Sequence, residues 1–298
     1  MRAAILINPR SGQGRAARVG AAIERTLLDA GHETLTRTLG RDRWPTPDEL
    51  RGASALVVVG GDGTVHHAAG LAVESGTPLY HAASGNENLF ARAFDMRPDP
   101  REVRRAIEEG AIERIDRARC NGVGFVLMCS AGPDASVIHR LSRARRRPTG
   151  HLAYAWPILA EAFSPRIPWV NVWVDGRELV CRRRGMVVIA NMRQYALRID
   201  PCQSAEADDA RLDVTFLPCT TSLGTIARLA ACRARVQGRL GAVQGRGTRV
   251  RVEIEGDEPK VQLDGEAPPA DSPASLASVL DCAVDAGALP VLTPPSNG

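Results

Sequence analysis

In the first third of the chain, short apolar runs alternate with stretches in which apolar residues recur at helical spacing. The apolar runs lie at 3–7, 55–59 and 79–82. The helical stretches lie at 15–30, 65–72 and 89–94. A continuous apolar run is typical of a strand that is buried on both faces of a sheet. The alternation therefore predicts a parallel sheet with crossover helices, the pattern of an α/β domain.

After about Arg117 the pattern changes, and short strands dominate. Strands are predicted at 125–128, 169–174, 186–190, 212–217 and 250–254. Helices are predicted at about 135–146, 152–163 and 222–235. Asp175-Gly176 and Asp264-Gly265 are turn sequences of β-hairpins. The second half is therefore expected to form a mostly antiparallel β domain.

Composition excludes several classes of function. The 298 residues carry a net charge of +4, and Lys260 is the only lysine. Neither a GxxxxGK[ST] phosphate loop nor the strand lysine of a protein kinase is therefore present. Aromatic residues make up 4% of the chain, too few for the stacking platforms that bind single-stranded nucleic acid. No nucleic-acid partner is expected, whereas the mild positive charge suits anionic small molecules or an anionic surface.

The seven cysteines include no CxxC pair, which predicts free thiols in a reducing cytosol rather than disulfides or a zinc site. The apolar part of residues 1–12 is too short for a secretory signal, and no apolar run reaches transmembrane length. A cytoplasmic location is expected, with any membrane contact peripheral and at the inner face.

The strongest chemical pattern is GGDGT at 60–64, directly after the apolar run 55–59 and before a helical stretch. Its glycines allow a tight turn and leave no Cβ to block a phosphate group, while amides at the helix start point into the same space. Asp62 is placed to hold Mg²⁺ or a ribose hydroxyl. Thr64 can cap the helix or donate to a phosphate oxygen. The alternative is a simple strand-to-helix turn.

Two further polar loops that contain glycine follow predicted strands, at 8–12 and 84–88. The carboxyl ends of parallel strands lie at one edge of the sheet. The three loops are therefore expected to converge on one crevice, where open α/β sheets bind ligands. This arrangement favours phosphate binding over a simple turn at 60–64.

Six segments, in the same order, resemble the diacylglycerol kinase catalytic-domain family of lipid kinases, which is distantly similar to NAD kinases and 6-phosphofructokinases. They are NPRSG at 8–12, GGDGT at 60–64, GNENLFAR at 85–92, AGPDA at 131–135, Asp208-Asp209 and LDGE at 263–266. The resemblance covers nearly the whole chain. It implies an α/β nucleotide-binding domain at 1–118, a β-sandwich-like domain at 119–284 with the general base and the lipid acceptor site, and a tail at 285–298 that returns to the first domain.

The resemblance also implies roles for individual residues. The positions matching the ATP site are Asn8, Pro9, Ser11, Gly12, Gly60, Gly61, Asp62, Gly63, Thr64, Gly85 and Asn86. Asp264 matches the general base and Glu266 the acidic residue beside it, and phosphorylating a hydroxyl needs such a carboxylate within hydrogen-bond reach. Asp209 matches a position that binds a structural Mg²⁺ in some bacterial members. From the residues alone, Asp264-Gly265 is a plain hairpin turn and Asp209 a solvated loop residue.

Three positions depart from the family pattern. Asn86 stands where the third loop usually has threonine, so a hydroxyl that faces the nucleotide is lost. His66-His67 replaces an Asn-Glu pair. Adjacent histidines on a helix point about 100° apart, so they form a poor metal site and are expected at the pocket edge or on the helix surface. Ala210 replaces glycine beside Asp209, which weakens the predicted structural-metal site.

These observations predict an ATP- and Mg²⁺-dependent kinase of a lipid hydroxyl. One alternative is a kinase of a soluble acceptor such as NAD. The other is a nucleotide- or lipid-binding module without catalysis, which the changes at Asn86 and His66-His67 motivate. The sequence does not identify the lipid.

Two arginine clusters bear on membrane contact. One follows the predicted helix at 135–146, at Arg140, Arg143, Arg145, Arg146 and Arg147. With Trp156 and Phe163 on the next helix, it could meet an anionic membrane surface, or it could be a solvated charged face. The second cluster, Arg182 to Arg184, is expected to form a strand-end surface.

Overall fold

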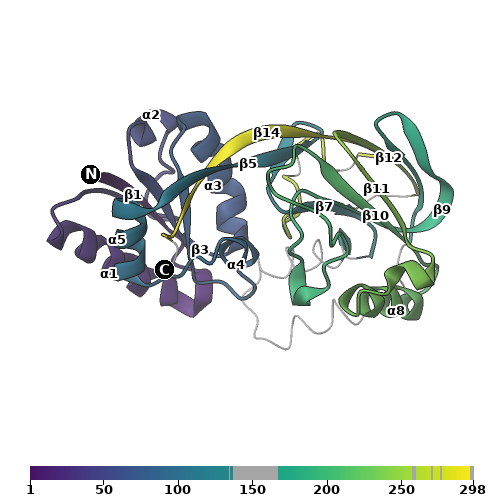
Figure 1. Ribbon diagram of the computed structural model, residues 1–298, viewed down its shortest axis with the longest axis horizontal. Helices are drawn as coiled ribbons and strands as arrows, with labels where there is room; N and C mark the ends of the chain where they lie inside the picture. Colours follow the sequence, from purple (N-terminus) through teal and green to yellow (C-terminus); the bar gives the residue numbers. More distant parts are fainter. Residues whose placement is uncertain (134, 137–166, 257–259, 270, 276, 296–298) are drawn as a thin grey trace. The chain divides into compact units, whose positions relative to one another are not determined.

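The structure is a computed structural model that describes residues 1–133, 135–136, 167–256, 260–269, 271–275 and 277–295. The chain divides into two compact units, Met1–Ile115 with Gly287–Gly298, and Asp116–Ala286 (Figure 1). The two helices predicted near 135–146 and 152–163 fall almost entirely outside the described residues. The first arginine cluster, Trp156 and Phe163 lie outside them as well.

The first unit is built on parallel strands. They are β1 (Arg2–Ile7), β2 (Glu33–Thr38), β3 (Ala55–Gly60) and β4 (Leu79–Ala83). Their order is β4-β3-β1-β2, and the end of β14 (Val279–Thr293) pairs in parallel with β4 at Val291 and Leu79. Every residue of β3 and β4 is buried, as their continuous apolar runs require. The predicted parallel α/β sheet is confirmed.

Helices connect these strands. They are α1 (Arg15–Asp29), α2 (Pro47–Leu50), α3 (Asp62–Ser75), α4 (Leu89–Ala93) and α5 (Pro100–Glu109). The apolar pattern did not predict β2 or α5. Strand β2 is an edge strand that pairs with β1, so most of its residues are polar and half exposed. Helix α5 begins at a proline that follows Asp99, whose side chain accepts two backbone N–H bonds, an N-cap that the sequence contains.

The second unit is built on strand pairs that are antiparallel wherever their register is given. Its strands are the end of β5 (Ala111–Cys120), β6 (Val123–Phe125), β7 (Met128–Ala131), β8 (Trp169–Val174), β9 (Arg177–Ala190), β10 (Leu212–Pro218), β11 (Val243–Gly247), β12 (Arg249–Glu255), β13 (Val261–Leu263) and the start of β14. Strand β9 pairs with β8 along its first half and with β7 and β10 along its second. The predicted antiparallel domain is confirmed.

One predicted strand is wrong. The apolar run 125–128 is divided between β6 and β7, and Val126 and Leu127 lie in a bend. These two residues are buried like strand residues, at 1% and 2% exposure, so hydrophobicity could not reveal the break. Their N–H groups bond to a side chain instead of a neighbouring strand.

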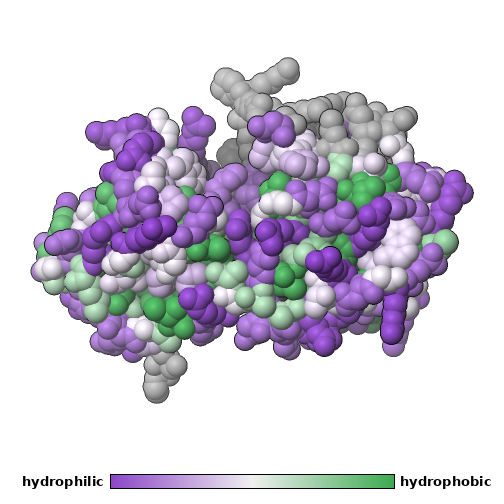
Figure 2. All heavy atoms as spheres, turned by 90° about the horizontal axis from the view of Figure 1, so that it is seen from above, coloured by the Kyte–Doolittle hydropathy of each residue, from purple (hydrophilic) through white to green (hydrophobic). Residues whose placement is uncertain are grey.

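Apolar side chains from the strands form the core of the second unit, with Phe125, Val187, Phe216 and Val252 among its fully buried members. Helix α8 (Ser222–Arg233) was predicted, and Thr221 caps it. The face drawn in Figure 2 is mainly hydrophilic, with apolar residues in small groups. Among the described helices, none is both long and apolar enough to cross a membrane.

Candidate active site

Three loops of the first unit leave adjacent strands at the same edge of the sheet. Strand β3 lies between β1 and β4, with Ile7 paired to Val59 and Gly60 paired to Ala83. The loops therefore begin side by side, at Asn8, Gly61 and Ser84. Backbone bonds join them, because Asn8 N–H donates to the carbonyl of Val59 at 2.9 Å and Ser84 N–H to that of Gly60 at 2.7 Å.

Glycines let the three loops touch through their backbones. A Cβ at Gly85 would lie 2.8 Å from the Cα of Gly61, and a Cβ at Gly12 would lie 2.2 Å from the carbonyl oxygen of Ser84. Gly12 also has a φ of 59°, which favours glycine. Neither contact leaves room for a side chain, so the loops form one surface made largely of main chain.

Asn8 and Thr64 join the first loop to α3. Asn8 Nδ2 donates to Thr64 Oγ1 at 2.9 Å. Gly61 is the N-cap of α3, which begins at Asp62, so Thr64 lies within the first turn and does not cap the helix as one sequence prediction had it. With 4% exposure, Thr64 is held mainly inside the unit.

Asp62 and Asn88 fix the third loop. Asp62 Oδ1 accepts a bond from the N–H of Phe90 at 3.1 Å, which ties the start of α3 to α4. The Asn88 side chain forms hydrogen bonds with both backbone polar groups of Gly85. Its Oδ1 accepts from the Gly85 N–H at 2.9 Å, and its Nδ2 donates to the Gly85 carbonyl at 3.0 Å. Between these bonds Asn86 is exposed, at the position where its carboxamide replaces the family hydroxyl.

His81 supports the turn from inside the unit. It is fully buried on β4, and its Nε2 lies 3.0 Å from the carbonyl oxygen of Gly60. Burial lowers the pKa of His81, although the charge of Asp62 acts in the opposite direction. His66 and His67 lie farther along α3, with ring centroids 5.0 Å apart in an edge arrangement, and His67 is exposed.

Asp264 and Gly265 form the predicted tight turn of the second unit. Their φ angles are 51° and 79°, as in a type I′ turn, and Leu263 and Glu266 exchange two backbone bonds of 2.9 Å across it. The turn follows β13, which pairs with β7. Glu266 is half-buried next to it.

The Asp264 carboxylate is held by three backbone N–H groups. Oδ2 accepts from Val126 at 2.8 Å, and Oδ1 accepts from Leu127 and Met128 at 2.7 and 3.0 Å. Asp264 is 6% exposed, and its own N–H bonds to the carbonyl of Met128. The turn and the bend at 126–127 therefore fix the carboxylate in one orientation.

Asn191 is a buried residue that the sequence did not single out. Its Nδ2 donates to the carbonyls of Val126 and Asp116, at 2.9 and 3.0 Å, and its own N–H bonds to Leu127. It thus holds the carbonyl side of the segment whose N–H groups hold Asp264. An asparagine that ends an apolar strand is the one sequence feature that could have indicated this role.

Asp209 pairs with an arginine. The guanidinium of Arg246 contacts Asp209 Oδ2 and lies 3.3 Å from Asp213 Oδ2. Asp209 Oδ1 also accepts from the N–H of Arg211. Arg246 therefore supplies a positive charge at the carboxylate where a structural Mg²⁺ is expected, and such an ion would have to share Asp209 with it.

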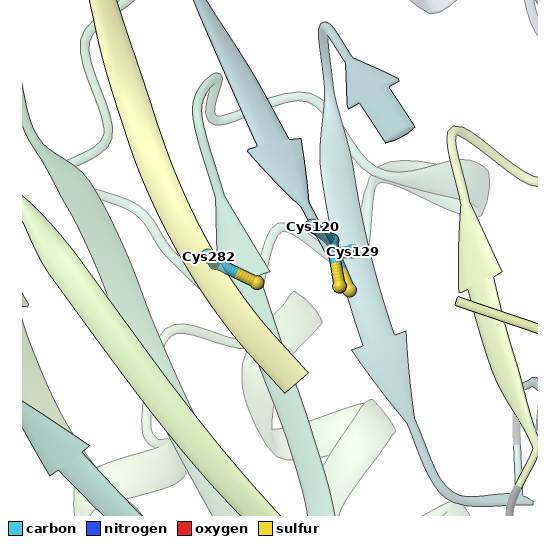
Figure 3. A group of neighbouring side chains, drawn as sticks. All are labelled: Cys120, Cys129 and Cys282. Atoms are coloured by element: carbon cyan, nitrogen blue, oxygen red, sulfur yellow. The ribbon is translucent and has the colours of Figure 1, made fainter. Parts of the chain in front are cut away.

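Three cysteines from separate strands meet in the core of the second unit. Figure 3 shows Cys120, Cys129 and Cys282, whose sulfur atoms all lie within 4.8 Å of one another. Their exposure is at most 2%, and a hydrogen bond between Cys120 and Cys129 lowers the pKa of the former and raises that of the latter. They belong to the apolar core, where a thiol packs as a small apolar group.

Two family models together match nearly the whole chain. The model described as "Diacylglycerol kinase catalytic domain" matches residues 2–120. The model described as "YegS C-terminal NAD kinase beta sandwich-like domain" matches residues 127–293.

Similar proteins agree with these matches. A protein named diacylglycerol kinase occurs in two strains of Mycobacterium tuberculosis and is 28% identical over 222 residues, 71% of this chain and 71% of that protein. A crystal structure of a putative diacylglycerol kinase from Bacillus anthracis has a TM-score of 0.69 at 18% identity and covers 99% of this chain and 98% of its own. A further structure from the same organism has a TM-score of 0.67 at 17% identity, with 100% and 98% covered, and both show the same fold.

Gly85→Ala tests the close contact between the loops. The added methyl group would lie 2.8 Å from Gly61 Cα, so the backbones must separate. We expect the free energy of unfolding, measured with urea, to fall by about 1–3 kcal/mol. Gly238→Ala is the control, since a Cβ there meets nothing within 4 Å. Equal losses in the two variants would contradict the tight contact.

His81 should make stability depend on pH. Because its pKa is lowered in the folded chain, the unfolded chain binds more protons as pH falls below about 6.5, and the free energy of unfolding should decline. His81→Gln cannot titrate and can still donate to Gly60, so part of this decline should disappear in urea unfolding measured between pH 5 and 8. The control variant His67→Gln retains the buried imidazole of His81, so its free energy of unfolding should still decline as the pH falls. An unchanged slope in His81→Gln would refute the assignment.

Arg246 should stabilise the second unit without a metal. Removing its charge in Arg246→Met leaves Asp209 and Asp213 without their shared cation, and we expect a loss of about 1–2 kcal/mol in the free energy of unfolding. Arg251→Met, at an exposed pair, should change little. EDTA should leave the melting temperature of the wild type unchanged, and a clear decrease would show that a metal is bound after all.

Proposed function

Because the chain belongs to the diacylglycerol kinase catalytic-domain family, whose members are lipid kinases, we propose that it transfers the γ-phosphoryl group of ATP to a lipid hydroxyl group. The proposed reaction is Mg²⁺-dependent and takes place in the cytoplasm at the inner face of the membrane. The observation that carries this proposal is the main-chain surface formed by the three loops of the first unit.

ATP is assigned to this surface on chemical grounds. Phosphate groups bind where backbone N–H groups converge without side chains, and the start of a helix adds the positive end of its dipole. The contacts of Gly12 with Ser84 and of Gly61 with Gly85 keep side chains away from the start of α3. No lysine is required, because amides and arginines supply the positive charge, and Arg15 already reaches the carbonyl of Ser84 at 3.4 Å.

Asp62 is the residue that we assign to Mg²⁺. Its Oδ1 bonds to Phe90, so Oδ2 is the atom available for the ion. Within the described residues, the cysteine cluster is the one group of three or more potential ligands, so a carboxylate cage is lacking there. This fits an ion held mainly by ATP, since Mg²⁺ commonly takes one or two carboxylates together with substrate phosphates. When bound, it neutralises charge on the β- and γ-phosphate oxygens.

Asp264 is proposed as the general base and Glu266 as the acidic residue that assists it. A base must be fixed within hydrogen-bond reach of the acceptor hydroxyl, and three N–H bonds fix the Asp264 carboxylate. The tight turn and the catalytic assignment are therefore compatible. Asp264 has the positive φ angle that the turn requires, and in this conformation its carboxylate meets the N–H groups at the bend of Val126 and Leu127.

Two other functions are tested in parallel. A kinase of a soluble acceptor would phosphorylate NAD in buffer without detergent and leave lipid micelles untouched. A binding module would bind ATP without turnover on any lipid. The first experiment is transfer of radiolabelled γ-phosphate from ATP into a total lipid extract, followed by identification of the labelled lipid. Diacylglycerol, phosphatidylglycerol, a sphingoid base and a polyprenol are the acceptors to compare.

Asp264→Asn should abolish most turnover. The amide is a poor base, and its NH₂ group meets N–H donors at 126–128, so we expect turnover to fall by about 10²–10⁴-fold and the melting temperature to decrease. ATP binding to the first unit should persist, as measured by calorimetry. Asp281→Asn, an exposed aspartate, is the control. Wild-type turnover in Asp264→Asn would exclude Asp264 as the base.

A further inference from the structure

The second unit contains an open cavity of about 370 Å³ that the proposed reaction does not use. The cavity lies among the start of β8, the middle of β9, the end of β10 and the first turns of α8. Its charged and aromatic lining consists of Trp169, Arg182, Arg183, Arg184 and Arg228. None of the residues assigned to phosphoryl transfer lines it.

Positive charge is concentrated in this cavity. Within the described residues, one ion pair joins its arginines to a carboxylate, Arg182 Nε to Glu255 Oε2 at 3.3 Å. Arg184 directs two donors to the carbonyl oxygen of Ile167, each at 3.3 Å, and no carboxylate of the described residues forms an ion pair with it. A guanidinium presents a planar fork of donors that matches the oxygens of a phosphate group. The cavity therefore suits a phosphate better than a neutral ligand.

Arg228 has a donor that the protein leaves unsatisfied. Its Nη1 bonds to the carbonyl of Gly224 at 3.2 Å, but its Nε is buried and has no hydrogen-bond partner. A buried donor without an acceptor is costly, and Arg228 is one of the residues that line the cavity. The start of α8, where Thr221 accepts from the N–H of Gly224, adds the positive end of a helix dipole.

An irregularity in β9 directs three consecutive arginines to one cavity. A regular strand points successive side chains to opposite faces, but Arg182 has a φ of 39° and the register between β8 and β9 shifts near Val172. The guanidinium carbons of Arg182 and Arg184 lie 5.2 and 6.0 Å from the ring centroid of Trp169. Aromatic contact thus helps to position these cations beside the cavity.

Helix α8, whose first turns line the cavity, also carries exposed apolar side chains on another face. Leu223 and Ile226 of α8 are 79% and 56% exposed, and their spacing of three residues puts them on one side of the helix. Trp169 in the cavity wall is 40% exposed. Single exposed apolar residues are common, but exposed apolar side chains on a helix that also borders a cationic cavity are typical of a membrane-binding surface.

We propose that this cavity binds the phosphate group of an anionic phospholipid in a bilayer, while Leu223 and Ile226 enter the interface. A soluble phosphate compound would satisfy the arginines but leave both apolar side chains in water, so the lipid is favoured. The inference rests on the proposed function and deepens it, because a kinase of a membrane lipid must reach the bilayer that contains its acceptor.

Vesicle sedimentation of the full chain without ATP tests the site. The wild type should bind phosphatidylcholine vesicles much more tightly when they contain phosphatidylglycerol. Arg183→Gln with Arg184→Gln should weaken that binding about 25-fold, since each arginine near an anionic surface contributes about fivefold. Leu223→Ser with Ile226→Ser should weaken it at least about tenfold. Melting temperatures confirm that the variants fold.

Arg251→Gln and Ile112→Ser are matched controls, an exposed arginine of β12 and an exposed apolar residue of β5. Both should bind like the wild type. Equal loss in Arg251→Gln would mean that net charge alone drives binding and would overturn the site. Equal binding to both kinds of vesicle would also overturn it. Stabilisation by inorganic phosphate without vesicle binding would assign the cavity to a soluble ligand and overturn the membrane assignment.

Turnover is measured separately, with acceptor lipids in neutral detergent micelles. If no lipid is phosphorylated there but vesicle binding still depends on Arg183 and Arg184, the proposed function fails and the headgroup site stands. If turnover in micelles is normal and vesicle binding is insensitive to the arginines, the kinase assignment stands and the headgroup site fails.

Discussion

The close contact between the backbones of Gly61 and Gly85 is the constraint on which the first unit depends. Parallel pairing brings the ends of β1, β3 and β4 to one edge, but the loops can share that edge only if no side chain separates them. This contact allows two hydrogen bonds between the loops and their helices. Asn8 donates to Thr64, and Asp62 accepts from the N–H of Phe90 in α4. A surface built from the main chain also tolerates changes of exposed side chains at its rim, such as Asn86.

The second unit also positions chemistry through its backbone. Asp264 sits in a strained turn conformation, and three N–H groups from a broken strand hold its carboxylate. Asn191 holds the same segment from its carbonyl side, while Gln262 bonds to the N–H of Gly265 at 2.7 Å and to Ser130. Both neighbours are buried, so a change in either would move the carboxylate through the backbone rather than by direct contact.

The sequence predicted the parallel strands and the long helices. Strands β3 and β4 are continuous apolar runs of strand length, and the apolar residues of α1 recur at helical spacing. It missed β2, whose edge position allows polar residues, and it joined β6 to β7, because the bend at Val126 and Leu127 is as buried as the strands around it. Motifs identified candidate residues but not their contacts. The tie between Asp62 and Phe90, the pairing of Asp209 with Arg246 and the meeting of three cysteines all join residues far apart in the chain.

If a chain with one lysine binds phosphate as proposed, it must do so without the lysine that most kinases use, and its two units offer different groups for this. In the first, the proposed function gives main-chain amides the place of the phosphate-loop lysine, which is possible only because glycines bring the loops into contact. In the second, arginines of β9 lie over the rings of Trp169 and Phe216, an arrangement that an ammonium group could not reproduce with the same geometry. The scarcity of lysine is therefore compatible with phosphate chemistry. The planar guanidinium groups of arginine and the backbone N–H groups both donate to phosphate oxygens in fixed directions, whereas the ammonium group of lysine acts as a point charge.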